Sequence, residues 1–245
     1  MEPIRALLFD VFGTLVDWRT AVAREVEAVA VRHGVSVDAL AFADAWRAQY
    51  QPSMEAIRSG REPFCPLDAL HRRNLDAILP QFGLGGLDAT ARAELNLAWH
   101  RLDAWPDAAS GLARLRRTFR LAPCSNGNVS LMVDLARRND FPWDAILGAE
   151  LARDYKPKPI VYLASAAAFG CAPEETMMVA AHTSDLVAAA ALGLLTAFVA
   201  RPDEFGAGRG GEARPGAPVD VAVASLTELA DRLASGTPRS LNVPD

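Results

Sequence analysis

The chain has 245 residues, of which 51% are hydrophobic and 22% are charged, an ordinary composition for a globular protein that argues against extensive disorder. The net charge of −5 and the pI near 5.4 argue against nucleic acid or an anionic membrane as partner, because either would favour clustered Lys and Arg. The length allows one large domain or a core with an inserted subdomain. A small anionic substrate would still need a local cationic pocket.

The N-terminal residues and the cysteines favour a cytoplasmic location. The first apolar run, at residues 4–9, is too short for a signal peptide or a membrane span. Cys65, Cys124 and Cys171 lie far apart and form no CxxC pair. We therefore expect reduced, buried thiols rather than a disulfide framework or a zinc site.

The first predicted element is a strand at residues 4–9, a nearly continuous apolar run that ends in Asp10 and is followed by Gly13 and Thr14. Such a run is typical of a buried strand that ends in a polar turn. Residues 20–102 instead carry long helical patterns, without a convincing strand. Examples are residues 22–31, 39–50 and 91–102. We expect this segment to form a helical cap.

Short apolar runs and helical patterns alternate after Trp105-Pro106. The patterns predict strands at residues 119–124, 145–147, 176–181, 195–199 and 219–223. They predict helices at residues 130–138, 160–169 and 185–192, and a glycine-rich loop at residues 206–218. This alternation predicts an α/β fold, with a Rossmann-like, doubly wound parallel sheet and an inserted helical cap.

These elements divide the chain into expected domains. Residues 1–16 and 105–235 would form the α/β catalytic core, residues 17–104 the helical cap, and residues 236–245 a flexible tail. Ligands of such sheets bind outside the carboxyl ends of the strands. Asp10, Ser125 and Asp185 all fall at predicted strand ends, which makes this edge the candidate active site.

Four short motifs occur in order at these strand ends. They are Asp10-Val11-Phe12-Gly13-Thr14, Ser125-Asn126-Gly127, Lys156-Pro157 and Asp185. Each is weak alone, but together they resemble the haloacid dehalogenase superfamily, in which an aspartate after the first strand is the nucleophile. The resemblance covers nearly the whole chain and implies that Asp10 is the nucleophile.

Two features differ from the phosphatases of this superfamily, which look like Asp-x-Asp-x-Thr. Their second aspartate protonates the leaving alkoxide, and Phe12 stands in its place here. They also hold magnesium with acidic residues of the fourth motif, which here has one carboxylate, Asp185. Both differences favour a leaving group such as halide, which departs as a stable anion. We therefore expect no metal and no cofactor.

The pattern Asp-x-Phe-Gly-Thr is similar to that of the type II (L-2-haloacid) dehalogenases. The resemblance implies that Arg47, which follows Trp46, receives the halide together with Asn126. It also implies a functional role for Tyr162. The residues predicted to bind substrate or halide are Phe12, Trp18, Tyr50, Asn126, Tyr162 and His182.

The resemblance implies a two-step covalent displacement. Asp10 would attack the carbon that bears the halogen, and water would then hydrolyse the ester to release a 2-hydroxy acid. Asp185 is the expected base for that water, and Lys156 would keep nearby carboxylates ionised. Thr14 and Ser125 would bind the substrate carboxylate and orient the nucleophile. The predicted catalytic residues are Asp10, Thr14, Arg47, Ser125, Lys156 and Asp185.

His182 departs from the family pattern. Type II dehalogenases commonly have Ser-Ser-Asn where this chain has Ala180-Ala181-His182. His182 either replaces the missing hydrogen bonds, marks another substrate, or is a structural polar residue. Together with the aromatic cap residues it motivates the hypothesis that fluoroacetate is accepted, because extra donors around a small pocket would help fluoride to leave.

Structural interpretations stay open beside these roles. Arg47 could belong to a solvated helix face, and Asp185 could cap its helix. Trp18 and Tyr50 could be core residues, as we expect for His71 and Trp99. His33 and His100 look like ordinary helix residues.

The predicted activity is metal-independent hydrolysis of small 2-haloacids. The alternatives are a phosphatase of the same superfamily, a non-catalytic small-anion binding protein, and a related enzyme with a non-halogenated substrate. The family often forms dimers, so a homodimer is a further expectation, although no segment identifies its interface.

Overall fold

The computed structural model describes residues 3–235, and its centre is a six-stranded parallel sheet in the order β5-β4-β1-β6-β7-β8. Because β1 lies between β4 and β6, the chain winds away from it in both directions. This arrangement confirms the doubly wound sheet. The strands are β1 (Ala6–Phe9), β4 (Arg120–Ser125), β5 (Leu147–Gly148), β6 (Thr176–Ala180), β7 (Leu195–Val199) and β8 (Val221–Val223).

Strand β1 is apolar at every position because both faces of the sheet are covered. Leu7 and Phe9 belong to one buried cluster, and Leu8 belongs to the other. The helices that pack with the first cluster are α6 (Ala108–Leu115), α7 (Val129–Asn139) and α11 (Leu226–Ala234). Those on the second side are α8 (Ala149–Ala152), α9 (Pro159–Ala168) and α10 (Thr183–Ala190), with the short η3 (Pro173–Glu175).

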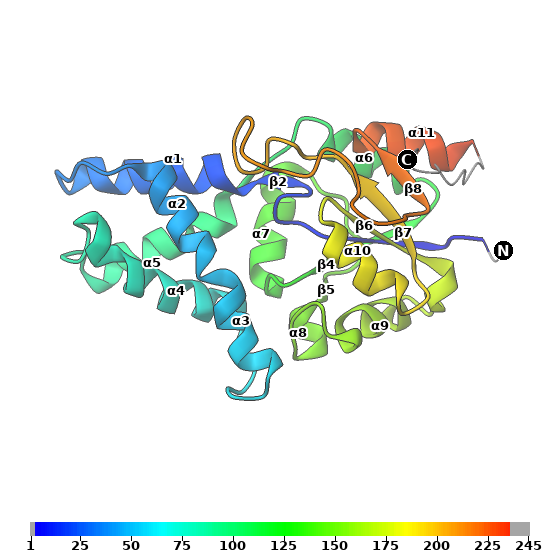
Figure 1. Cartoon of the computed structure of the whole chain (residues 1–245), viewed down its shortest axis with the longest axis horizontal. Helices are drawn as coiled ribbons and strands as arrows, with labels where there is room; N and C mark the ends of the chain where they lie inside the picture. Colours follow the sequence, from blue (N-terminus) through cyan, green and yellow to red (C-terminus); the bar gives the residue numbers. More distant parts are fainter. Residues whose placement is uncertain (1–2, 236–245) are drawn as a thin grey trace.

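The inserted helices lie between two very short strands, β2 (Val16–Asp17) and β3 (Asp103–Ala104), which pair antiparallel. Figure 1 shows these helices gathered beside the sheet, on the side away from β8 and α11. This confirms the inserted helical cap. The helices are α1 (Trp18–Arg32), α2 (Ala39–Ala48), α3 (Tyr50–Arg58), α4 (Leu67–Ile78) and α5 (Ala89–Asn96), with η1 (Leu79–Phe82) and η2 (Leu97–Arg101).

The division at residues 16/17 and 104/105 stays a proposal, which the β2–β3 pairing supports. The predicted tail, residues 236–245, lies outside the described residues.

Capping side chains decide where several cap helices begin. Asp17, Asp38 and Asp88 each accept a hydrogen bond from the backbone N–H three residues later. Helix α1 therefore starts four residues before the predicted start at 22. The helix predicted at residues 39–50 ends earlier, because Gln49 N donates to Trp46 O in a tighter turn and α3 begins at Tyr50.

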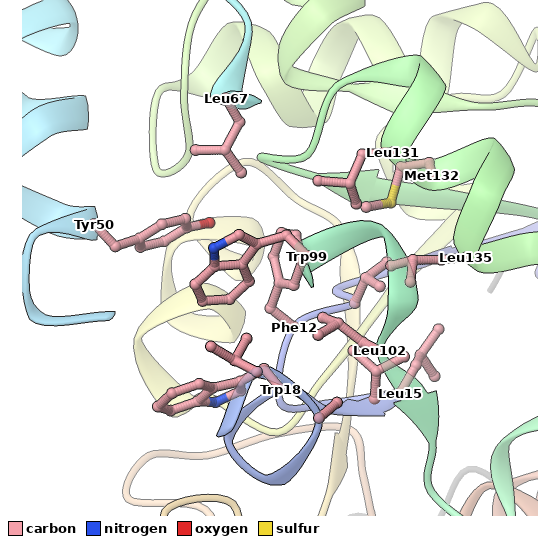
Figure 2. Close-up of a cluster of buried hydrophobic side chains, with 14 of the residues drawn as sticks. Phe12, Leu15, Trp18, Tyr50, Leu67, Trp99, Leu102, Leu131, Met132 and Leu135 are labelled. Atoms are coloured by element: carbon pink, nitrogen blue, oxygen red, sulfur yellow. The ribbon is translucent and has the colours of Figure 1, made fainter. Parts of the chain in front are cut away.

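An apolar cluster joins the cap to the core above β1, and Figure 2 shows its members converging. The Trp18 and Trp99 rings stack with centroids 6.2 Å apart, and Phe12 meets Trp99 edge-on at 5.8 Å. All three side chains are buried. This contact fixes the cap over the carboxyl end of β1. Further members of the cluster are Leu15, Leu67, Leu102, Leu131, Met132 and Leu135.

The expectation that His100 is an ordinary helix residue is wrong. It lies in η2, its side chain is buried, and its Nδ1 lies 2.7 Å from Asp134 Oδ2 of α7. Its Nε2 lies 3.1 Å from the carboxylate oxygens of Asp68 in α4. Burial opposes the charge of the ring, but the two carboxylates outweigh it and raise the pKa of His100 above 6.5. This imidazole therefore links cap and core.

Replacing His100 with Gln tests this link. A raised pKa means that the folded state binds the proton more tightly, so the stabilisation is complete below the unfolded value near 6.5 and disappears as pH rises through the folded pKa. We expect His100→Gln to lower the free energy of unfolding by about 1–3 kcal/mol in mildly acidic buffer, and by less in alkaline buffer. Urea denaturation measures both, with the exposed His33→Gln as control. An equal loss at both pH values would contradict the ionic link.

The three cysteines are free; Cys124 and Cys171 are buried, whereas Cys65 is half-buried and so differs from the expectation. Within residues 3–235, none of the helices combines the length and apolar character needed to cross a membrane.

Candidate active site

Asp10 follows β1 directly, where the carboxyl ends of β4 and β6 flank it. Its backbone N donates to Val179 O at 3.0 Å, which extends the pairing with β6 by one residue. The Thr14 hydroxyl donates to Asp10 Oδ2 at 2.7 Å and accepts from the backbone N of Ala181 at 2.9 Å. The turn after β1 and the end of β6 therefore fix one oxygen of a buried carboxylate.

Lys156 lies between Asp10 and Asp185. Its Nζ is 2.8 Å from Asp10 Oδ1 and 2.6 Å from Asp185 Oδ2, and all three side chains are buried. Its backbone N donates to Asn126 Oδ1 at 2.8 Å, which ties it to the end of β4. Burial opposes the charge of Lys156, but the carboxylates of Asp10 and Asp185 hold its pKa well above its usual value. One buried ammonium thus balances two carboxylates.

Asp185 occupies the first turn of α10, whereas the cap position of that helix is His182. The side chain of Asp185 accepts from Lys156 and from the Tyr162 hydroxyl. It makes no capping hydrogen bond, so the interpretation of Asp185 as a helix cap is wrong. Tyr162 and Lys156 instead hold one oxygen each of its carboxylate.

His182 supplies a second cation beside Asp10. Its Nδ1 lies 3.2 Å from Asp10 Oδ2, and its Nε2 lies 2.9 Å from Glu204 Oε2. Burial opposes protonation, but these two carboxylates outweigh it and raise the pKa of His182 to about 10. Burial likewise opposes ionisation of Asp10, yet Lys156 and His182 hold its pKa well below the usual range. At neutral pH Asp10 is therefore an ionised carboxylate between two cations.

A cavity of about 590 Å³ opens over these groups and extends toward the cap. Most of the predicted site residues line it. They are Asp10, Phe12, Arg47, Tyr50, Asn126, Lys156, Tyr162, His182 and Asp185. Three others, Thr14, Trp18 and Ser125, are buried but do not form its wall.

Arg47 reaches the cavity from α2 and lies among aromatic rings. Its guanidinium carbon is 4.1 Å from the ring centre of Tyr50 and 5.3 Å from that of Trp18. Its Nη1 is buried without a hydrogen-bond partner among the described residues. A solvated position for Arg47 is therefore wrong. An unpaired buried N–H is costly, so this group is prepared to receive an anion.

Thr14, Ser125 and Trp18 contact other protein groups. Thr14 holds Asp10, and the Ser125 hydroxyl oxygen accepts from the backbone N of Gly127 at 3.1 Å. Trp18 packs behind Arg47 and donates from its indole nitrogen to Glu204. The predicted contact of Thr14 and Ser125 with the substrate carboxylate stays a prediction.

Two acidic residues were missed by the sequence reasoning. Glu204 is buried in the segment after β7, and Glu212 lines the cavity and accepts from the backbone N of Thr183 at 3.1 Å. Glu212 belongs to the glycine-rich loop at residues 206–218, and Glu204 lies two residues before it. A loop that follows the carboxyl end of a parallel strand faces the active-site edge, and that position was the available signal.

The acidic residues in the described part of the structure lack the arrangement that a cation needs. Within the described part of the chain, no group of three or more His, Cys, Asp and Glu side chains is arranged to hold a metal ion. Lys156 Nζ stands between Asp10 and Asp185, within hydrogen-bonding distance of both.

The sequence pattern of the haloacid dehalogenase-like hydrolases matches residues 4–193. This chain belongs to that family of hydrolases. The family resemblance expected from the four motifs is thereby confirmed.

Individual relatives narrow the comparison. The (S)-2-haloacid dehalogenase 1 of Pseudomonas sp. (strain CBS-3) is 31% identical over 213 residues, which are 84% of this chain and 89% of the relative. The (S)-2-haloacid dehalogenase 4A of Burkholderia cepacia is 29% identical and spans 98% of this chain and 99% of its own.

Solved structures agree with the sequence relatives. A defluorinating L-2-haloacid dehalogenase superposes with a TM-score of 0.92 and 47% identity over 94% of this chain and 95% of its own. A second L-2-haloacid dehalogenase superposes with a TM-score of 0.91 and 43% identity, over 95% of this chain and 99% of its own.

Proposed function

We propose that this protein is an (S)-2-haloacid dehalogenase-type hydrolase that converts small 2-haloacids to 2-hydroxy acids without a metal. The proposal rests mainly on one observation. The ionised, buried Asp10 lies at the base of a cavity whose wall also holds the unpaired Nη1 of Arg47. A nucleophile and an anion-binding group thus share one cavity. The names of the curated relatives support the same reaction.

In the first step, Asp10 attacks the carbon that bears the halogen and forms an ester. The halogen leaves with the electrons of its bond, and Arg47 receives it beside the rings of Phe12 and Tyr50. A weakly hydrated guanidinium among aromatic rings suits an anion that no longer has its water shell. Because halide needs no proton to leave, Phe12 can occupy the place of an acid.

In the second step, water attacks the carboxyl carbon of the Asp10 ester. Asp185, which Lys156 and Tyr162 hold in position, takes a proton from that water. Breaking the bond between the carboxyl carbon and the ester oxygen releases the 2-hydroxy acid and restores Asp10. The hydroxyl oxygen of the product therefore comes from Asp10.

The reaction class is tested by halide release from both enantiomers of 2-chloropropionate and from chloroacetate, with a chelator present. We expect release from the S enantiomer and from chloroacetate. A magnesium-supplemented aryl phosphate assay is the comparison. Phosphate release without halide release would favour the phosphatase, and silence in both assays would favour a binding protein.

Fluoroacetate is a further proposed substrate, because the imidazolium of His182 lines the same cavity and its positive charge can stabilise departing fluoride. A solved relative described as defluorinating, at 47% identity, supports this extension. Fluoride release from fluoroacetate measures it. Chloride release without detectable fluoride would restrict the enzyme to the heavier halides.

Replacing Arg47 with Lys tests its proposed role. Lysine keeps the charge but loses the planar donors and the stacking on Tyr50, so we expect halide release to fall about 100-fold. Arg72→Lys, on the partly exposed face of α4, is the control with the same chemical change. Halide release and thermal unfolding of both variants measure the effect. Equal activity of Arg47→Lys and wild type would exclude Arg47 from the halide site.

The remaining expectations concern the oligomeric state and the cellular location of the protein. A homodimer and a cytoplasmic location stay proposals, which sedimentation and cell fractionation would test.

A further inference from the structure

Glu204 is a buried carboxylate next to the active site that the reaction above does not use. Its Oε1 accepts from Trp18 Nε1 at 3.1 Å, and its Oε2 faces His182 Nε2 at 2.9 Å. Its side chain is only 2% exposed, and the described contacts give it no Lys or Arg partner. A buried charge is costly unless a cation or several donors balance it. The cation that balances Glu204 is His182.

The turn after β1 is shaped to accommodate this carboxylate. Gly13 has φ +84°, and a Cβ built there would lie 2.1 Å from Glu204 Oε1. Glu204 therefore packs directly against the backbone of the turn that connects Asp10 to Thr14. Two separate features, the glycine and the Trp18 indole, hold the Glu204 carboxylate in one place.

We propose that Glu204 is a positioning residue that holds His182 as an imidazolium, with its Nδ1–H directed at Asp10 Oδ2. The proposal rests on the proposed role of Asp10 as nucleophile. Neutral histidine has one ring N–H, whereas the contacts with Asp10 and Glu204 require a donor at both nitrogens. Only the protonated ring satisfies both carboxylates.

The two carboxylate oxygens of Asp10 have different hydrogen-bond donors. Oδ2 accepts from Thr14 and His182, whereas Oδ1 accepts from Lys156. Two fixed donors suit the oxygen that remains the carbonyl of the ester and carries the negative charge when water attacks. Oδ1 is then the oxygen that attacks the substrate.

Ester hydrolysis balances with these groups. Water bonds to the carboxyl carbon and gives a proton to Asp185, while the carbonyl electron pair moves onto Oδ2. This electron pair re-forms the carbonyl as the bond between the carboxyl carbon and Oδ1 breaks. The leaving alkoxide takes a proton from Lys156, and Asp185 then passes the proton that it took from water to Lys156. The acid form of Asp10 then ionises. His182 stays protonated throughout and stabilises the charge on Oδ2.

Several charged groups face His182. Asp10 and Glu204 contact it, and the shared cavity also holds Lys156, Asp185, Arg47 and Glu212. Among the described residues, only Glu204 touches the nitrogen turned away from Asp10. Removing the charge of Glu204 therefore removes one of the two contacts that keep the ring protonated.

The direct test follows the ring nitrogens of the four histidines by NMR titration, without substrate. His182→Asn assigns the signal. We expect Glu204→Gln to lower the pKa of His182 by about one unit or more, and Glu204→Asp to restore part of the shift. An unchanged titration in Glu204→Gln would overturn the proposal. Because no haloacid is present, this result is independent of whether the protein is a dehalogenase.

The kinetic test compares Glu204→Gln, His182→Asn and the double variant. We expect Glu204→Gln to lower halide release about tenfold or more at neutral pH and to move the alkaline limit of activity to lower pH. The double variant should be no worse than His182→Asn, since Glu204 acts through His182. Losses that multiply in the double variant would overturn the proposal.

A further measurement shows whether Glu204→Gln slows ester formation or ester hydrolysis. If His182 stabilises the charge on Oδ2, hydrolysis is impaired more than ester formation, and Glu204→Gln accumulates the Asp10 ester in the intact mass after mixing with chloroacetate. Absence of that ester, with slow release, would overturn the assignment of His182 to the second step. Glu94→Gln, in an exposed ion pair, is the matched control.

Discussion

Asp10→Asn is expected to abolish halide release, with a loss of at least about 10⁵-fold, because the amide has nearly the same shape as the carboxylate but is not a nucleophile. The replacement keeps an oxygen that can accept from Thr14 or Lys156. Halide release under substrate saturation measures the loss. Asp140→Asn is the control, since Asp140 is an exposed helix-end residue with φ 55°, a conformation that asparagine tolerates.

An isotope experiment distinguishes a nucleophile from a base at position 10. In a single turnover in water enriched in heavy oxygen, hydrolysis of the proposed ester places heavy oxygen in the carboxylate of Asp10. The first molecule of hydroxy acid stays unlabelled. Mass spectrometry of the peptide that contains residue 10 reads the label. Heavy oxygen appearing first in the hydroxy acid would show direct attack by water and would contradict the ester.

Lys156→Met is expected to remove activity and to lower the free energy of unfolding by about 3–5 kcal/mol at neutral pH. Methionine fills similar volume, but it leaves the buried carboxylates of Asp10 and Asp185 without their shared cation. Urea denaturation and halide release measure the two effects. Lys158→Met is the matched control, because Lys158 is the only other lysine of the chain.

The loss of stability in Lys156→Met should depend on pH. In the wild type the lowered pKa of Asp10 contributes stability above its unfolded value near 3.8, and this is lost as pH falls through the folded pKa. Without Lys156, burial favours the protonated acid, so the deficit should shrink as pH falls toward that value. A deficit that stays constant with pH would indicate lost packing rather than an uncompensated charge.

The sheet could be predicted because its strands carry strong local patterns. The run before Asp10 is apolar on both faces, and residues 195–199 were predicted with the observed bounds. Strands β2 and β3 could not be predicted, since two residues show no periodicity. The break between α2 and α3 depends on one tight backbone turn at Gln49, which leaves no mark in the apolar pattern.

The site was predictable where a short motif sits at a strand end. Asp10, Lys156 and Asp185 meet through contacts within 2.8 Å, as the motif order implied. Glu204 escaped prediction because its partners, Trp18 and His182, lie 186 and 22 residues away. His100 escaped for the same reason, since Asp68 and Asp134 are distant in sequence. Pairs of this kind arise from tertiary packing alone.

The β2–β3 pairing has a consequence for how this enzyme can change. Val16 pairs with Ala104 and Asp17 with Asp103, so the chain leaves the sheet and returns to it at one point. The residues proposed to cleave and restore the ester, Asp10, Lys156 and Asp185, lie outside this excursion, whereas Arg47 and Tyr50 lie inside it. A recombined gene that exchanged the segment between β2 and β3 would transplant Arg47 and Tyr50 together and would leave Asp10, Lys156 and Asp185 in place.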